Sequence, residues 1–378
     1  MSTAAGAARI AAGTPLGRER VVDGLRAIAM LGVVAGHWLV TGLTAGPAGD
    51  LHQASPLSAM PGLTPLTWAL QTLGLFFFVA GYAAAHGLGR ARQRGGSAGS
   101  WLAGRARRLL PPVAVFLGVW LLILTALRHT AADPWTLHTL GTLAVSPLWF
   151  VLVLALLLPL TPPALGAVDR VGAAAALLPL GALTAMDALR YLLWPGMPGW
   201  LGYLNCVTAW LVPYTLGVAA ARGRLAGPRR GRGLLVAGVA GGALLIAAGY
   251  PASLVGVPGD GRSNLDPPSL LTAALSAAQI GLALLLWARM DRGLRHPGWW
   301  AAVAGLNLRV MTIFLWHQSA LLAVAVLGHA LAGARTGLVG PPDSAGWIAY
   351  RLLWLPVVAV ALAALCLLFR RAESRGGA

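Results

Sequence analysis

Apolar runs long enough to cross a bilayer recur along the whole chain, and this limits the fold more than any other feature. The 378 residues are 57% hydrophobic and 10% charged, whereas a typical soluble domain is about 25% charged. Because a spanning helix needs ~20 apolar residues, we predict an all-α polytopic membrane protein of about ten transmembrane helices. The fourth run is short and the ends of the ninth are poorly defined, so nine or eleven spans are also compatible with the sequence. The predicted spans are residues 22–42, 66–86, 109–127, 145–160, 171–190, 205–221, 233–250, 269–289, 308–330 and 347–369.

The net charge of +17 comes from arginines that gather in alternate loops. This is the positive-inside pattern, and it predicts that the N and C termini are both cytoplasmic in a multi-pass protein of the cell membrane. Topology explains the charge, so we expect no nucleic-acid partner and a secondary contact with anionic lipids. The clusters are Arg9, Arg18 and Arg20; Arg90, Arg92, Arg94, Arg105, Arg107 and Arg108; Arg222, Arg224, Arg229, Arg230 and Arg232; Arg289, Arg292 and Arg295; and Arg370, Arg371 and Arg375.

The domain organisation follows from the same pattern. We predict a disordered cytoplasmic tail at residues 1–20, one membrane-embedded domain at 21–370, and a second cytoplasmic tail at 371–378. Cys206 and Cys366 fall in predicted spans without metal-ligand spacing, so we expect no metal site.

Two polar residues in the first span are candidate site residues. Arg26 and His37 are eleven positions apart, which places them on nearly one helix face at a separation of about 16 Å. Both are costly in lipid, so a purely structural span would normally omit them. Arg26 could instead pair with Asp23 at the cytoplasmic interface, and a neutral His37 could hydrogen-bond a neighbouring helix. Otherwise His37 is suited to act as a general base.

Further candidates lie in other spans. Arg105 and Arg108 share a face at the start of the third span, where they could bind phosphate oxygens or act only as a positive-inside anchor. Pro111 and Pro112 should break or kink that helix. His317 in the ninth span fits a buried core histidine better than a site residue. No carboxylate lies at mid-bilayer, which disfavours an ion-coupled carrier.

The motif DGLRAIA at residues 23–29, followed by His37, resembles the opening signature of the acyltransferase type 3 family of multipass membrane acyltransferases. In that family the arginine and histidine are also separated by ten residues. The segment RARRLLP at residues 105–111 resembles the second signature of the family, R-x-x-R ahead of a proline.

Weaker similarities lie elsewhere. Residues 77–82 are similar to the family segment F-F-x-x-S-G-[FY] with Ala80 in place of serine, which makes Gly81 a site-lining candidate besides a helix-packing position. Trp149 and His317 belong to segments 148–150 and 313–317, which resemble weaker sequence patterns of the family.

The resemblance implies a ten-span enzyme that transfers an acyl group, by default acetyl, from cytoplasmic acyl-CoA to a hydroxyl of a glycan, a lipid-linked sugar or a small natural product. We expect acyl-CoA as co-substrate and no permanently bound cofactor. His37 would be the base and Arg26 would orient the donor or stabilise the oxyanion. Arg105 and Arg108 would hold the donor phosphates, with Asp23, Gly81, Trp149 and His317 lining the site. The alternative is a transporter or flippase for a lipid-linked or amphipathic solute, with Arg26, His37 and His317 as binding groups.

Overall fold

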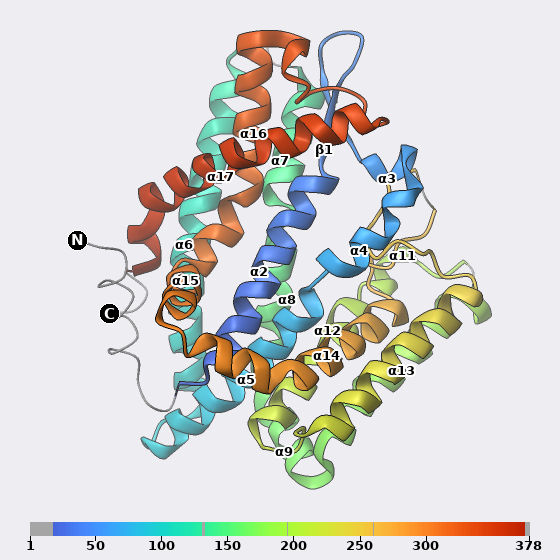
Figure 1. Cartoon of the computed structure of the whole chain (residues 1–378), viewed down its shortest axis with the longest axis vertical. Coiled ribbons are helices and arrows are strands. Elements are labelled where there is room, and N and C mark those ends of the chain that lie inside the picture. Colours follow the sequence, from blue (N-terminus) through green and yellow to red (C-terminus); the bar gives the residue numbers. More distant parts are fainter. Residues whose placement is uncertain (1–17, 131–132, 195, 260, 375–378) are drawn as a thin grey trace.

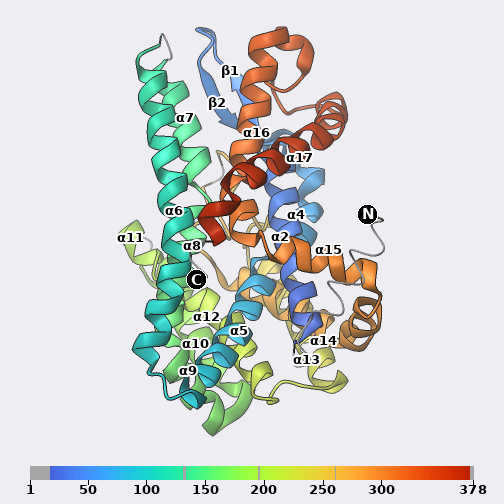
Figure 2. The ribbon, with the colours of Figure 1, turned by 90° about the vertical axis from the view of Figure 1, so that its left-hand side faces the viewer.

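The computed structural model describes residues 18–130, 133–194, 196–259 and 261–374. These residues are mostly helical, with only two short strands, which confirms the all-α prediction (Figures 1 and 2). The elements in chain order are α2 (Arg20–Val40), β1 (Gly42–Ala45), β2 (Leu51–Ala54), α3 (Pro56–Ala59), η1 (Pro61–Leu63), α4 (Thr64–Leu70), α5 (Leu73–Gln93), α6 (Ala98–Arg128), α7 (Pro134–Val145), α8 (Leu148–Leu157), η2 (Leu158–Leu160), α9 (Thr161–Val171), η3 (Gly172–Ala176), α10 (Leu177–Ala188), η4 (Leu189–Leu193), α11 (Gly199–Gly202), α12 (Asn205–Ala221), α13 (Pro228–Ala247), α14 (Leu270–Leu294), α15 (Pro297–Asn307), α16 (Val310–Ala332), η5 (Gly333–Thr336) and α17 (Ala345–Ser374).

Nine helical stretches of the described residues are long and apolar enough to cross a membrane. One of them, Pro134–Leu193, is 60 residues long and contains both the fourth and the fifth predicted spans. Because one crossing needs only ~20 residues, this stretch has room for two. The chain turns at Gly172, which follows α9 and has a φ of 64°, a conformation that glycine adopts easily.

The connections differ in detail from the sequence-based expectation. Residues 87–104, which lie between the predicted spans 66–86 and 109–127, are mostly helical, because α5 continues to Gln93 and α6 begins at Ala98. Helix α6 also runs unbroken through Pro111 and Pro112, so the expected break is absent. In a bilayer, the remaining backbone hydrogen bonds have no water to replace them, which favours keeping the helix intact.

The tails also differ from the prediction. Helix α17 extends to Ser374, into the segment expected as a C-terminal tail. The predicted disorder of residues 1–20 falls almost wholly outside the described residues, and α2 begins at Arg20.

Glycines allow the central helices to approach closely. A Cβ on Gly81 of α5 would clash with the carbonyl oxygen of Tyr214 on α12, and one on Gly217 of α12 would clash with the carbonyl oxygen of Phe78. Without a strong hydrophobic force between helices in lipid, such small residues let backbones pack directly.

Helix α2 connects the two ends of the molecule. It rises from the end that carries the α5–α6 turn to the end that carries the small antiparallel hairpin of β1 and β2 (Figure 1). Leu43 of this hairpin forms a parallel bridge with Val339, and the backbone N–H of Leu51 donates to Thr136 Oγ1 at 2.9 Å. The hairpin therefore joins the end of α2 to the segments that precede α8 and α17.

Candidate functional site

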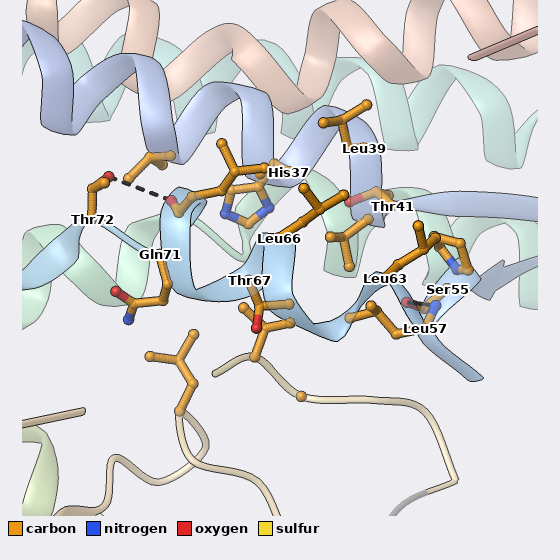
Figure 3. A pocket seen from close by; sticks show the side chains of 18 of the residues that line it. His37, Leu39, Thr41, Ser55, Leu57, Leu63, Leu66, Thr67, Gln71 and Thr72 are labelled. Carbon is orange, nitrogen blue, oxygen red and sulfur yellow. Dashed lines mark hydrogen bonds between the residues drawn. The ribbon is translucent and has the colours of Figure 1, made fainter. Parts of the chain in front are cut away.

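Two separate cavities lie along α2, and no residue lines both of them. The first has a volume of about 930 Å³ and lies at the end of the molecule with the α5–α6 turn. The second has a volume of about 280 Å³ and lies toward the hairpin, between α2, α4 and α8 (Figure 3). The residues that line them differ: arginines are frequent around the first cavity, and the second is largely apolar.

The first cavity, called the cationic cavity below, contains Asp23 and Arg26. Arg26 Nη1 lies 3.1 Å from Asp23 Oδ1, and Arg18 Nε donates to Asp23 Oδ2 at 2.6 Å. Asn307 Nδ2 donates to the Asp23 carbonyl oxygen at 2.9 Å and fixes α15 against α2. The pairing of Arg26 with Asp23, weighed above as a structural alternative, is therefore present, although Arg26 still lines the cavity.

Arginines without an acidic partner surround the same cavity. Arg105 is half-buried with its guanidinium 5.6 Å from the Trp101 ring, and a Cβ on Gly87 would lie only 2.7 Å from its Nη2. Arg108 is exposed and lines the cavity, whereas Arg107 does not. In the part of the chain that the structure describes, no carboxylate pairs with the unneutralised arginines Arg90, Arg94, Arg105 and Arg108. Such a cluster fits a ligand with several phosphate oxygens.

The second cavity, called the His37 cavity below, forms where α4 and α5 are interrupted. Gln71 and Thr72 are not helical, and Thr72 Oγ1 donates to the Ala29 carbonyl oxygen of α2 at 2.8 Å while Gln71 Oε1 accepts from Leu73 N. The Gln71 side chain thereby pairs with the first backbone N–H of α5, which the break would otherwise leave unpaired in the membrane. Figure 3 shows His37 projecting from α2 into the space beside α4. The imidazole is half-buried and lines the cavity.

His317 of α16 stands against His37. The ring centroids are 5.0 Å apart with an interplanar angle of 58°. His317 Nδ1 lies 2.6 Å from the carbonyl oxygen of Phe314, which can only accept, so Nδ1 carries the proton. His317 Nε2 is then a free acceptor, and it is buried without a hydrogen-bond partner.

The residues around this histidine pair lock α16 to its neighbours. Trp38 Nε1 donates to the His317 carbonyl oxygen at 2.9 Å, and Gln318 Nε2 donates to Thr41 Oγ1 at 3.2 Å. Trp120 Nε1 of α6 donates to Ser319 Oγ at 2.9 Å. Each of three consecutive residues on α16 thus has a fixed partner, which holds the two imidazoles in register.

The remaining site-lining candidates divide between the two cavities and the core. Trp149 lines the His37 cavity together with Phe150, whose ring centroid lies 5.0 Å from that of Phe314. Gly81 lines neither cavity and belongs to the α5–α12 contact instead.

Arg26 and His37 do not share a cavity, in contrast to the single site expected from their spacing. Met30 and Val33 lie between them on the same face of α2. Val33 lines the His37 cavity, whereas Met30 is fully buried and marks the partition between the two cavities.

Arg351 of α17 is a further candidate site residue that the sequence motifs did not indicate. This side chain lines the His37 cavity at a relative exposure of 4%. The available signal was a single arginine four residues into the predicted span 347–369, at the end where basic residues are scarce. In the described residues no cluster of histidine, cysteine or carboxylate side chains could hold a metal ion.

The helical fold and the two cavities define a polytopic membrane protein with room for two chemically different ligands. The family model described as an acyltransferase domain matches residues 20–370, so the chain belongs to this family and is an acyltransferase. The resemblance stated from the sequence motifs is thereby confirmed. No curated protein and no solved structure matches the chain.

Proposed function

We propose that the protein is a membrane O-acyltransferase that uses cytoplasmic acyl-CoA and transfers its acyl group, acetyl or similar, to a hydroxyl held beside His37. The observation that carries this proposal is the division of labour between the cavities along α2: one is strongly cationic and the other contains a paired imidazole. The acceptor class is a glycan, a lipid-linked sugar or a small natural product.

The cationic cavity supplies the donor site. The phosphates of acyl-CoA would pair with Arg105 and Arg108, which have no carboxylate of their own among the described residues. Arg26, held by Asp23, would stand between these phosphates and the acyl group. Opening of the partition at Met30, an unbranched and flexible side chain, would bring the thioester toward His37.

The His37 cavity supplies the base. His37 accepts the hydroxyl proton as the acceptor oxygen attacks the thioester carbonyl carbon. A new C–O bond forms, the C–S bond breaks, and the leaving thiolate takes up the proton to give CoA. His317 acts as a positioning residue, because its free Nε2 can accept an N–H of His37 and leave the other His37 nitrogen unprotonated.

The test is consumption of radiolabelled acetyl-CoA by the purified full-length protein in lipid nanodiscs. Replacement His37→Ala should lower the rate of thioester cleavage by about 10²- to 10⁴-fold, the usual contribution of a general base. The matched control is His129→Ala, because His129 is exposed at the end of α6 and lines neither cavity. Undiminished cleavage in His37→Ala protein would exclude His37 as the base. In a parallel assay with the protein in closed liposomes, label that enters the lumen with its thioester intact would favour the transporter.

A further inference from the structure

Arg351 is a buried arginine in the wall of the His37 cavity. Its guanidinium lies 4.7 Å from the ring of Trp347, one turn earlier on α17. No carboxylate among the described residues lies within ion-pair distance of it. Its Nη1 is buried and has no hydrogen-bond partner. A buried charge without a partner costs several kcal/mol, so its retention points to a ligand that supplies the missing negative charge.

Two other unused donors line the same cavity. Trp347 Nε1 is buried without an acceptor, and so is Gln71 Nε2. The orientation of the Gln71 amide is fixed because its Oε1 accepts from Leu73 N at 3.2 Å. Buried polar groups are normally paired, so three orphaned donors around one cavity require a ligand rich in acceptor oxygens.

The rest of the wall is apolar. Leucines from α2, α3, η1 and α4 line the cavity, so an aliphatic chain can lie against them (Figure 3). These leucines are Leu39, Leu57, Leu63, Leu66 and Leu70. A ligand that satisfies both parts of the wall has an anionic oxygen-rich group and an apolar portion.

Helix α17 holds the arginine in place independently of any ligand. Trp354 Nε1 donates to the Thr336 carbonyl oxygen at 2.9 Å, which anchors α17 to the segment before it. The part of α17 that carries Arg351 is therefore held in place, and the arginine itself is buried beside the cavity.

We propose that the His37 cavity binds an anionic amphiphile, with Arg351 and Trp347 holding its phosphate or carboxylate group, and that this amphiphile is the acyl acceptor. The binding site is inferred from the cavity alone, and only its assignment to the acceptor rests on the proposed function. The anionic group and the hydroxyl to be acylated would occupy the same cavity, with the hydroxyl directed toward His37.

The experiment measures binding to purified full-length protein in nanodiscs of zwitterionic lipid, without acyl-CoA. The probes are radiolabelled decyl phosphate and the uncharged decyl maltoside. Arg351→Met should weaken decyl phosphate binding by about 10- to 100-fold, as loss of a charge-assisted hydrogen bond predicts, and leave decyl maltoside binding unchanged. Arg128→Met is the matched control, because Arg128 is an exposed arginine at the end of α6 that lines neither cavity.

Thermal unfolding provides the second measurement. Decyl phosphate should raise the Tm of the wild type and of the Arg128→Met protein but not that of the Arg351→Met protein. Without ligand, Arg351→Met should unfold at the same or a higher temperature, since the variant no longer buries an unpaired charge. Equal affinity of decyl phosphate for the wild type and Arg351→Met, or a lower Tm of the ligand-free variant, would overturn the proposal.

One further arm, competition by inorganic phosphate, separates the possible outcomes. Competition by inorganic phosphate would show that the anionic group alone is recognised, as for a soluble acceptor, whereas no competition would indicate a lipid-anchored one. Because binding is measured without acyl-CoA, failure of thioester cleavage would refute the proposed function and leave the anion site standing.

Discussion

His37 is half-buried in a largely apolar cavity, and among the described residues no carboxylate lies within ion-pair distance of it, whereas the ring of His317 lies beside it. The ring of His317 is fixed through its Nδ1, and its Nε2 is left available to the ring of His37 5.0 Å away. Both histidines are visible in the sequence, but their contact is not, because they lie on helices from opposite ends of the chain. No periodicity along either helix encodes which residue of the other helix stands opposite.

If His317 positions His37, its removal should lower kcat more than it changes KM for acetyl-CoA. We expect His317→Leu to lower kcat for thioester cleavage by about tenfold or more. This is only part of the 10²- to 10⁴-fold that a general base contributes as a whole. His317→Gln should recover part of this loss, since its amide oxygen can still accept a hydrogen bond. Steady-state kinetics of both variants, with Tm as a check on folding, provide the measurement. Equal kcat in the two variants would argue against positioning.

At the scale of the elements, spans could be predicted from the sequence, but their interruptions and contacts could not. The predicted span 66–86 did not show the break at Gln71 and Thr72, where Thr72 Oγ1 donates to the Ala29 carbonyl oxygen of α2, a residue far away in the sequence. Conversely, Pro111 and Pro112 suggested a break that helix α6 does not have. In the first case a hydrogen bond to another helix accompanies the departure from the local sequence signal. In the second case the lack of water in the bilayer favours the intact helix over that signal.

The α5–α12 contact gives a test at this scale. Gly217→Ala would place a methyl group against the carbonyl oxygen of Phe78 on α5, where backbone cannot easily give way. We expect the substitution to destabilise the protein by about 3 kcal/mol and to lower its Tm in scanning fluorimetry. Gly118→Ala on α6 is the control: a Cβ there meets nothing within 4 Å, and alanine favours the helix. Equal Tm values for the two variants would show that the helices are not so closely packed.

Across the whole molecule, the two cavities lie beside different parts of α2 and are separated by the packed core around Met30. The sequence placed Arg26 and His37 on one stripe of α2 but could not show that Met30 closes the space between them, since closure depends on helices packed from elsewhere. The arginine clusters, by contrast, were evident in the composition of the loops, and five of their members line the cationic cavity: Arg18, Arg90, Arg94, Arg105 and Arg108. The charge distribution of the sequence is therefore kept in the fold as a division between an arginine-rich end and the end with the His37 cavity.

This division predicts that changes at the two ends affect different kinetic constants. Arg108→Gln should raise KM for acetyl-CoA by about tenfold, through loss of a charge-assisted contact to phosphate, and leave kcat unchanged. The control is Arg107→Gln at the preceding position of α6, which removes the same charge from a residue that does not line the cavity. His37→Ala should show the reverse, a lower kcat at constant KM. Measurements at increasing salt should bring the KM of the wild type toward that of Arg108→Gln, because salt screens exposed charges. If Arg107→Gln and Arg108→Gln raise KM equally, the phosphates are attracted by the overall charge of this end of the molecule rather than bound in the cationic cavity.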